Sequence, residues 1–153
     1  MGKDTSWLPF WEGFGVVDAH SDAHAVRVWL EPLPTHELRC GRCRRRVQRV
    51  HERVHRRVRD LPMLGRSVEL HVRLLRLDCP HCGRCLQHVS WLDRHSRLTR
   101  RLALAAAHGC ERMPVLHVAQ SFGLHWSTVK QLDQRRLRAE LDRLPPRPSP
   151  SVW

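Results

Sequence analysis

The chain has 153 residues, and its 27 lysines and arginines against 15 aspartates and glutamates give it a formal net charge of +12. A chain of this length holds one ordinary domain or two very small ones, and very small domains are short of buried core, for which a bound metal is one remedy. The charge favours a polyanionic partner, and the lack of a long apolar run or a signal-peptide pattern excludes a membrane-spanning or exported class.

Strand-like sequence fills the first half of the chain. Val16–Asp18 and Ala25–Leu30 are predicted to be two short strands joined by a turn. Val68–Leu77 alternates mainly apolar and polar residues, which is typical of a strand with one buried face. Two weaker strand signals and a turn precede it, at residues 47–50, 54–58 and 61–65. We therefore expect a β-hairpin or meander in this region.

Two cysteine pairs flank that predicted hairpin, as Cys40-Gly-Arg-Cys43 and Cys79-Pro-His-Cys82-Gly. In a reducing cytosol, paired Cys-x-x-Cys motifs more often bind metal than form disulfides. Four thiolates complete the tetrahedral shell of a structural zinc ion. We therefore predict one structural Zn²⁺ held by Cys40, Cys43, Cys79 and Cys82.

Other ligand sets stay open at this point. Cys82 and Cys85 have the same spacing as Cys79 and Cys82, so Cys85 is an alternative to Cys79. Disulfides or unligated core cysteines are further alternatives. The twelve histidines include no His-Glu-x-x-His motif, so we expect surface or phosphate contacts from them rather than a catalytic metal.

Three helices are predicted in the last third of the chain. The first is rich in leucine and alanine, is capped by Thr99 or Ser96, and ends at Gly109, a residue type favoured after helix C-termini. Pro114 suits the start of the second helix. The predicted ranges are 98–108, 115–121 and 126–143. A proline-rich stretch comes after them, and we expect it to be irregular.

Residues 115–132 fit the spacing of a helix-turn-helix. Ala119 is small where the two helices cross, Gly123 supplies the positive φ of the turn, and Val129 falls on the buried face of the second helix.

The second helix of this pair would lie in the major groove of DNA, with its N-terminal residues near base edges. Gln131 is placed to bind adenine, Ser127 or Thr128 to hold phosphate, and the arginines after position 134 to reach the backbone. The predicted DNA-binding residues are His125, Trp126, Ser127, Thr128, Lys130, Gln131 and Arg135. An ordinary helical pair is the alternative, as is a Trp126 that packs on the first helix.

These features predict an α+β chain, with a small β-rich N-terminal segment carrying a four-cysteine zinc finger, followed by an all-α helix-turn-helix module. The predicted parts are a short β-rich segment (1–36), a zinc-finger domain (37–92), a helix-turn-helix DNA-binding domain (96–144) and a proline-rich tail (145–153).

The chain resembles the N-terminal region of ISL3-family bacterial transposases from about Leu8 to Arg143. The stretches that carry the resemblance are Cys40–Cys43, Val58–Pro62, Leu74–Cys82, Leu98–Ala103 and Gly123–Val129. The resemblance implies the same four zinc ligands and a helix-turn-helix that binds the inverted repeats at the ends of a mobile element. Such transposases continue into an RNase H-like domain whose acidic residues bind two divalent metals. This chain ends before such a domain, so we expect it to bind double-stranded DNA and not to cut it.

Competing hypotheses are a stand-alone zinc-dependent transcriptional regulator derived from a transposase, a zinc-stabilised protein adaptor and a nuclease. The charge argues against the adaptor and the lack of carboxylate clusters against the nuclease. A leucine stripe would pack on the zinc module, form a homodimer or dock a missing domain; its members are Leu132, Leu137, Leu141 and Leu144. We expect a cytoplasmic, nucleoid-associated chain with no membrane partner and no small-molecule substrate.

Overall fold

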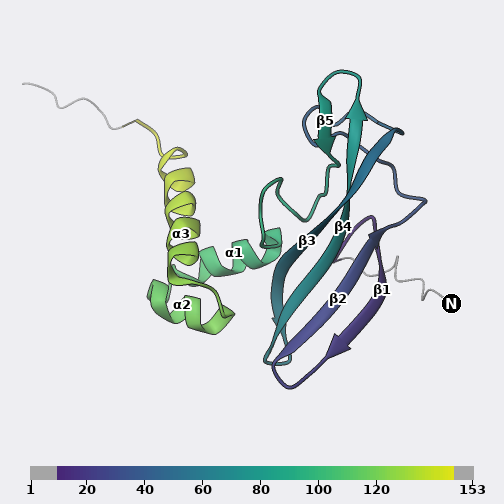
Figure 1. Ribbon diagram of the computed structural model, residues 1–153. Coiled ribbons are helices and arrows are strands. Elements are labelled where there is room, and N and C mark those ends of the chain that lie inside the picture. The colour runs from purple at the N-terminus through teal and green to yellow at the C-terminus, as the bar shows by residue number, and fades with distance from the viewer. Residues whose placement is uncertain (1–9, 147–153) are drawn as a thin grey trace, which may run out of the picture. The chain divides into compact units, whose positions relative to one another are not determined.

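The computed structural model describes residues 10–146, which fall into two compact units divided between Ala103 and Leu104. A five-stranded sheet makes up most of the first unit, and its strands run in the order β1-β2-β4-β3, with β5 paired to β4 (Figure 1). The strands are β1 (Phe14–Ser21), β2 (Ala25–Pro32), β3 (Val50–Met63), β4 (Arg66–Cys79) and β5 (Gly83–Leu86). The helices are α1 (Arg100–Gly109), α2 (Val115–Phe122) and α3 (Trp126–Leu141).

β4 is the central strand of the sheet, and with the edge strand β3 it forms a long hairpin. The hairpin turns through Leu64 and Gly65, whose φ angles of 51° and 74° suit a two-residue hairpin loop. β2 then pairs with β4 in the parallel direction, from Ala25↔Ser67 to Leu30↔Val72. This pairing joins the N-terminal strands and the cysteine-bearing hairpin in one sheet.

The hairpin carries two separate core clusters. Alternate residues of β4, including Val68, Leu70 and Val72, are buried on one face with Phe14 and Trp91. The second cluster lies around the cysteines and includes the buried Val47 and Leu77. The sheet therefore has an ordinary apolar core in its middle and a cysteine-rich core at one end.

The stretch between β5 and α1 is tied to the edge strand β3. Arg59 accepts a hydrogen bond from the Thr99 N–H and donates one to the Arg97 carbonyl. The Thr99 hydroxyl donates to the buried carboxylate of Asp60 (2.7 Å) and accepts from the Leu102 N–H, as predicted for a helix cap. The first turn of α1 is therefore part of the sheet unit.

The second unit is built from the rest of α1 with α2 and α3. Its core consists of Ala106, Val118, Ala119 and Val129, all buried. The turn between α2 and α3 passes through Gly123, which has φ 60° and donates its N–H to the Gln120 carbonyl. No helix among residues 10–146 is long and apolar enough to cross a bilayer.

The predicted fold class is wrong. The β part is not a small segment with a finger attached, because strands from residues 14 to 86 form one five-stranded sheet. The C-terminal part is not an all-α module, because residues 87–99 form turns and isolated β-bridges, one of them from Leu98 to Arg59 of β3, and only three short helices come after them. The alternation of residues indicated strands but not their partners, so the parallel pairing of β2 with β4 could not be seen.

The helix ranges agree with the predicted ones within about two residues, because glycine and proline mark their ends. β5 was not predicted. The four-part domain division stays a prediction, and most of its proline-rich tail lies outside the described residues.

Candidate metal centre and nucleic-acid interface

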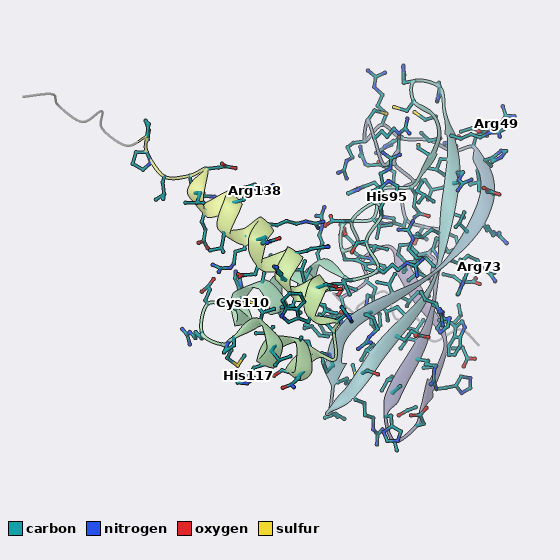
Figure 2. The ribbon with its side chains drawn as sticks, turned by 60° about the vertical axis from the view of Figure 1, so that its left-hand side comes forward. Arg49, Arg73, His95, Cys110, His117 and Arg138 are labelled. Atoms are coloured by element: carbon teal, nitrogen blue, oxygen red, sulfur yellow. The ribbon has the colours of Figure 1, made fainter. Side chains whose placement is uncertain are left out.

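Two backbone loops bring the cysteines together at one end of the sheet. Cys40 and Cys43 lie in the loop between β2 and β3, while Cys79 ends β4 and Cys82 lies in the turn to β5. The first loop is held against β5 because the Gly41 N–H donates to the Leu86 carbonyl (3.0 Å). Figure 2 shows sulfur atoms at the end of the sheet where Arg49 is labelled.

The sulfur geometry fits a tetrahedral metal ion. The Sγ atoms of Cys40, Cys43, Cys79 and Cys82 all lie within 4.8 Å of one another, and those of Cys43 and Cys79 are 3.7 Å apart. Zinc–thiolate bonds of about 2.3 Å in a regular tetrahedron place the sulfurs about 3.8 Å apart. The four residues present therefore have the ligand type and the spacing of a structural metal site.

The thiols of the site strongly affect one another's ionisation. Burial raises the pKa of Cys40, but hydrogen bonds from the Cys43 and Arg42 N–H groups outweigh it and lower that pKa to about 6. The contact with Cys43 raises the pKa of Cys82 to about 12, and burial with the contact to Cys40 raises that of Cys85 to about 11. One thiolate thus suppresses ionisation of its neighbours, and a divalent cation removes that penalty.

The two remaining cysteines lie in different places. Cys85 is buried on β5 with its sulfur 3.2 Å from that of Cys40, but it is not in the group of four among the described residues. Cys110 is half-buried in the helical unit, where burial raises the pKa of its thiol. The sequence alternative in which Cys85 takes the place of Cys79 therefore finds no matching four-sulfur group among the residues that the structure describes.

The first residues of α3 have defined roles in the helix end. His125 is the N-cap, and its Nδ1 accepts a hydrogen bond from the Ser127 N–H (3.3 Å). Trp126 is 47% exposed, and the Lys130 ammonium lies 4.9 Å from the centre of its ring. Trp126 is therefore available for an outside contact rather than buried on α2.

The other predicted DNA-binding residues follow on the same helix. Thr128 is half-buried, whereas Lys130, Gln131 and Arg135 are exposed. Ser127 is also half-buried, and its hydroxyl lies 2.7 Å from the His125 ring. The buried Val129 packs in the core of the helical unit.

Arg136 is engaged within its own helix. Its guanidinium pairs with Asp133 (2.8 Å) and Glu140 (2.8 Å). The hydrogen bonds to these carboxylates raise the pKa of Arg136. Among the arginines between position 134 and the end of the described residues, Arg136 is therefore the one that pairs with carboxylates.

The sheet also carries residues that the sequence analysis did not single out. Asp60 is almost fully buried, and its carboxylate accepts hydrogen bonds from Trp11 and Arg101 as well as Thr99. The sequence shows only a single aspartate in a strand, and its hydrogen-bond partners could not be predicted because they lie about 40 to 50 residues away along the chain. Elsewhere on the sheet, the His71 ring stacks on Trp29 with centroids 4.6 Å apart.

A four-thiol site on a β-sheet and a helix pair with an exposed polar second helix define a DNA-binding protein of the zinc-finger and helix-turn-helix kind. Two family models match the chain in that order. The zinc-finger of transposase IS204/IS1001/IS1096/IS1165 matches residues 36–89, and the helix-turn-helix domain of transposase family ISL3 matches residues 87–137. The chain corresponds to the N-terminal region of an ISL3-family transposase, which confirms the resemblance.

A curated relative supports the same conclusion. The chain is 42% identical over 135 residues to the transposase for insertion sequence element IS1001 of Bordetella parapertussis. The alignment covers 86% of this chain and 33% of the relative, so the chain spans about a third of the relative's length. No solved structure matches the chain.

Proposed function

We propose that this chain is the DNA-end-binding part of an ISL3-like transposase and that it recognises the inverted repeats at the ends of a mobile element. The observation that carries the proposal is α3, which presents exposed Lys130, Gln131 and Arg135 beyond a capped N-terminus. The match to the helix-turn-helix of ISL3 transposases supports it. Under this proposal, the chain binds DNA at the nucleoid in the cytoplasm, and the residues of this chain do not catalyse strand cleavage.

One structural Zn²⁺ held by Cys40, Cys43, Cys79 and Cys82 is part of the proposal. The ion supplies a cross-link of four thiolates between the β2–β3 loop and the β4–β5 turn. The chain's own contribution is to hold the loops in place, through the Gly41 N–H on Leu86 and the antiparallel pairing of β4 with β5. The role of this site is therefore stability and not catalysis.

α3 would act as the recognition helix. Gln131 presents an amide that pairs with the adenine edge, and Lys130 and Arg135 carry the charge for phosphate oxygens. Ser127 and Thr128 lie in the first turn, where hydroxyl and backbone N–H groups suit a phosphate. His125 keeps the helix start in place as its cap, and Trp126 adds an exposed aromatic surface.

The proposal includes a homodimer, because a transposition reaction must hold two element ends. Leu137, Leu141 and Leu144 are 44%, 66% and 64% exposed and offer an apolar stripe for a second copy. Light scattering of the full chain at micromolar concentration would give a dimer mass; a monomer at all concentrations, with and without DNA, would remove this part of the proposal.

Gln131→Ala tests the assignment of α3 directly. Its matched control is Gln134→Ala, which changes the same residue type on the same helix about one turn further from the N-terminus. We expect Gln131→Ala to reduce the discrimination between inverted-repeat DNA and a scrambled duplex by about 1–3 kcal/mol. Gln134→Ala should leave it unchanged. Competition binding with both duplexes gives the ratio, and equal effects of the two variants would disprove base contact by Gln131.

A further inference from the structure

A cavity lined by arginines opens on the sheet unit, and all of its lining residues belong to that unit. It has a volume of about 200 Å³ and lies between the first cysteine loop, β3 and the stretch that follows β5. Its charged and titratable lining residues are Arg44, Arg56, Arg94, Arg100, His88 and Asp93. The rest of the wall includes buried apolar side chains, so the cavity combines several guanidinium groups with an apolar lining.

Arg44 holds an unfavourable backbone conformation at this cavity. It directly follows Cys43 and has φ 64°, in the left-handed region. Gly83 directly follows Cys82 in the second cysteine loop and has φ 72°. The two loops therefore need the same backbone turn, and the first uses arginine where the second uses glycine. A non-glycine residue is unfavourable in this region, and such residues concentrate at functional sites.

The positive charges around the cavity are only partly neutralised. Asp93 is the one carboxylate among the described lining residues, and it already pairs with Arg100 (2.7 Å). Arg56 donates to the Arg94 backbone carbonyl (2.9 Å), and Arg44 donates to the His88 ring. Neither of these contacts supplies a negative charge.

The pKa shifts of two groups at the cavity indicate the same excess of positive charge. Burial and the charge of Arg97 lower the pKa of Arg56. Burial, followed by the charges of Arg44 and Arg100, lowers the pKa of His88. Like charges gathered beside a partly buried guanidinium destabilise the free protein, and an anion in the cavity reverses that effect.

We propose that this cavity binds a phosphate group, and that in the chain's DNA complex the group is a backbone phosphate of the duplex. Guanidinium groups from several elements match the oxygens of a phosphate through charge-assisted hydrogen bonds. The DNA source rests on the proposed function; the phosphate chemistry does not. The sheet unit then makes a sequence-independent contact in addition to the base contacts assigned to α3.

The first experiment tests the phosphate site without DNA. The metal-loaded full chain is titrated with inorganic phosphate against sodium chloride of equal ionic strength, and the arginine Nε–Hε signals are followed by NMR. We expect saturable shifts of the Arg56 signal and loss of saturable phosphate binding in Arg56→Gln. Arg57→Gln is the control, because Arg57 is the next residue of β3, pairs with His71 and faces the other side of the sheet. It should bind phosphate as the parent does.

The second experiment identifies the source of the phosphate. The slope of log affinity against log salt is measured for duplex DNA, and each lost phosphate contact reduces that slope by about 1. Arg56→Gln should reduce it by that amount and Arg57→Gln should not. Saturable phosphate binding with an unchanged slope would keep the site but assign it to a free phosphate compound. Equal loss in both variants would show that only total charge matters and would overturn the site.

Arg44→Gly guards against a variant that fails merely because it unfolds. Glycine suits this backbone turn, as it does at Gly83, so the variant should melt at the same or a higher temperature than the parent. It should nevertheless bind inorganic phosphate several-fold more weakly. Unchanged phosphate affinity in a stably folded Arg44→Gly protein would overturn the proposal, as would the lack of any saturable phosphate shift in the parent, whether or not the chain binds DNA through α3.

Discussion

At the scale of single residues, Asp60 joins several distant parts of the sheet unit. Its buried carboxylate holds the indole of Trp11, the hydroxyl of Thr99 and the guanidinium of Arg101. These groups lie before β1 and at the start of α1, far from Asp60 along the chain. Asp60 therefore links the N-terminal stretch, the edge strand β3 and the first turn of α1.

Asp60→Asn should destabilise the chain by about 3–5 kcal/mol, because it removes the charge of a fully buried carboxylate and leaves the half-buried Arg101 without a charged partner. Urea unfolding of the metal-loaded protein gives this difference. Glu31→Gln is the control, since it breaks the exposed ion pair with Arg73 (2.7 Å) and should change stability by less than about 1 kcal/mol. Similar losses in both variants would contradict a special role of Asp60.

The stability that Asp60 supplies should depend on pH. Burial raises the pKa of this carboxyl, but the hydrogen bonds from Arg101, Thr99 and Trp11 outweigh it and lower the pKa. A group with a lowered folded-state pKa stabilises the protein above its unfolded pKa, about 3.9, and loses that effect as the pH falls through the folded value. The stability difference between parent and Asp60→Asn should be constant from about pH 7 to 5 and shrink below about pH 4. A difference that instead grows in acid would contradict this sign.

At the scale of elements, the turn between α2 and α3 depends on Gly123. Its φ of 60° is unfavourable for residues with a Cβ, and asparagine tolerates it better than alanine. Gly123→Ala should cost about 1 kcal/mol and Gly123→Asn less. Thermal unfolding followed by helical circular dichroism checks the order, and an alanine variant as stable as the parent would show that the turn has another conformation.

The hairpin of β3 and β4 should respond unevenly to loss of metal. Its cysteine-rich end has little core of its own, whereas its middle packs through Leu70 and Val72. Chelation should therefore speed amide exchange in β5 and at Leu77 while Leu70 stays protected. Cys82→Ser should give the same pattern without chelator. Uniform exchange along β4, or no change on chelation, would contradict a local structural metal.

Much of the local structure could be predicted from the sequence, because its signals are local. Gly109, Pro114 and Gly123 mark helix ends, and the Cys-x-x-Cys spacing indicated the four thiols that the structure gathers. The sheet could not be predicted, because the pairing of β2 with β4 and the partners of Asp60 join distant residues. The special position of Arg44 could have been predicted from the sequence, because arginine follows Cys43 in the first cysteine loop where glycine follows Cys82 in the second.

At the scale of the whole molecule, the net charge of +12 sets the strength and salt dependence of binding. Arginine–phosphate contacts release counterions, so the affinity for any duplex should fall by about 10³-fold or more between about 50 and 200 mM salt if roughly six or more contacts form. Fluorescence anisotropy over that range measures the slope. An affinity that hardly changes with salt would rule out binding through phosphate contacts.

The most direct test of the central claim is selection of bound fragments from the genome of the source organism, with zinc present and at near-physiological salt. We predict enrichment of imperfect inverted repeats at the two ends of a mobile element, and loss of that enrichment in Gln131→Ala. Enrichment of a promoter site would instead indicate a regulator. Retention of bulk DNA with no preferred sequence would contradict the claim, because it would mean that the charge binds DNA and α3 reads none of it.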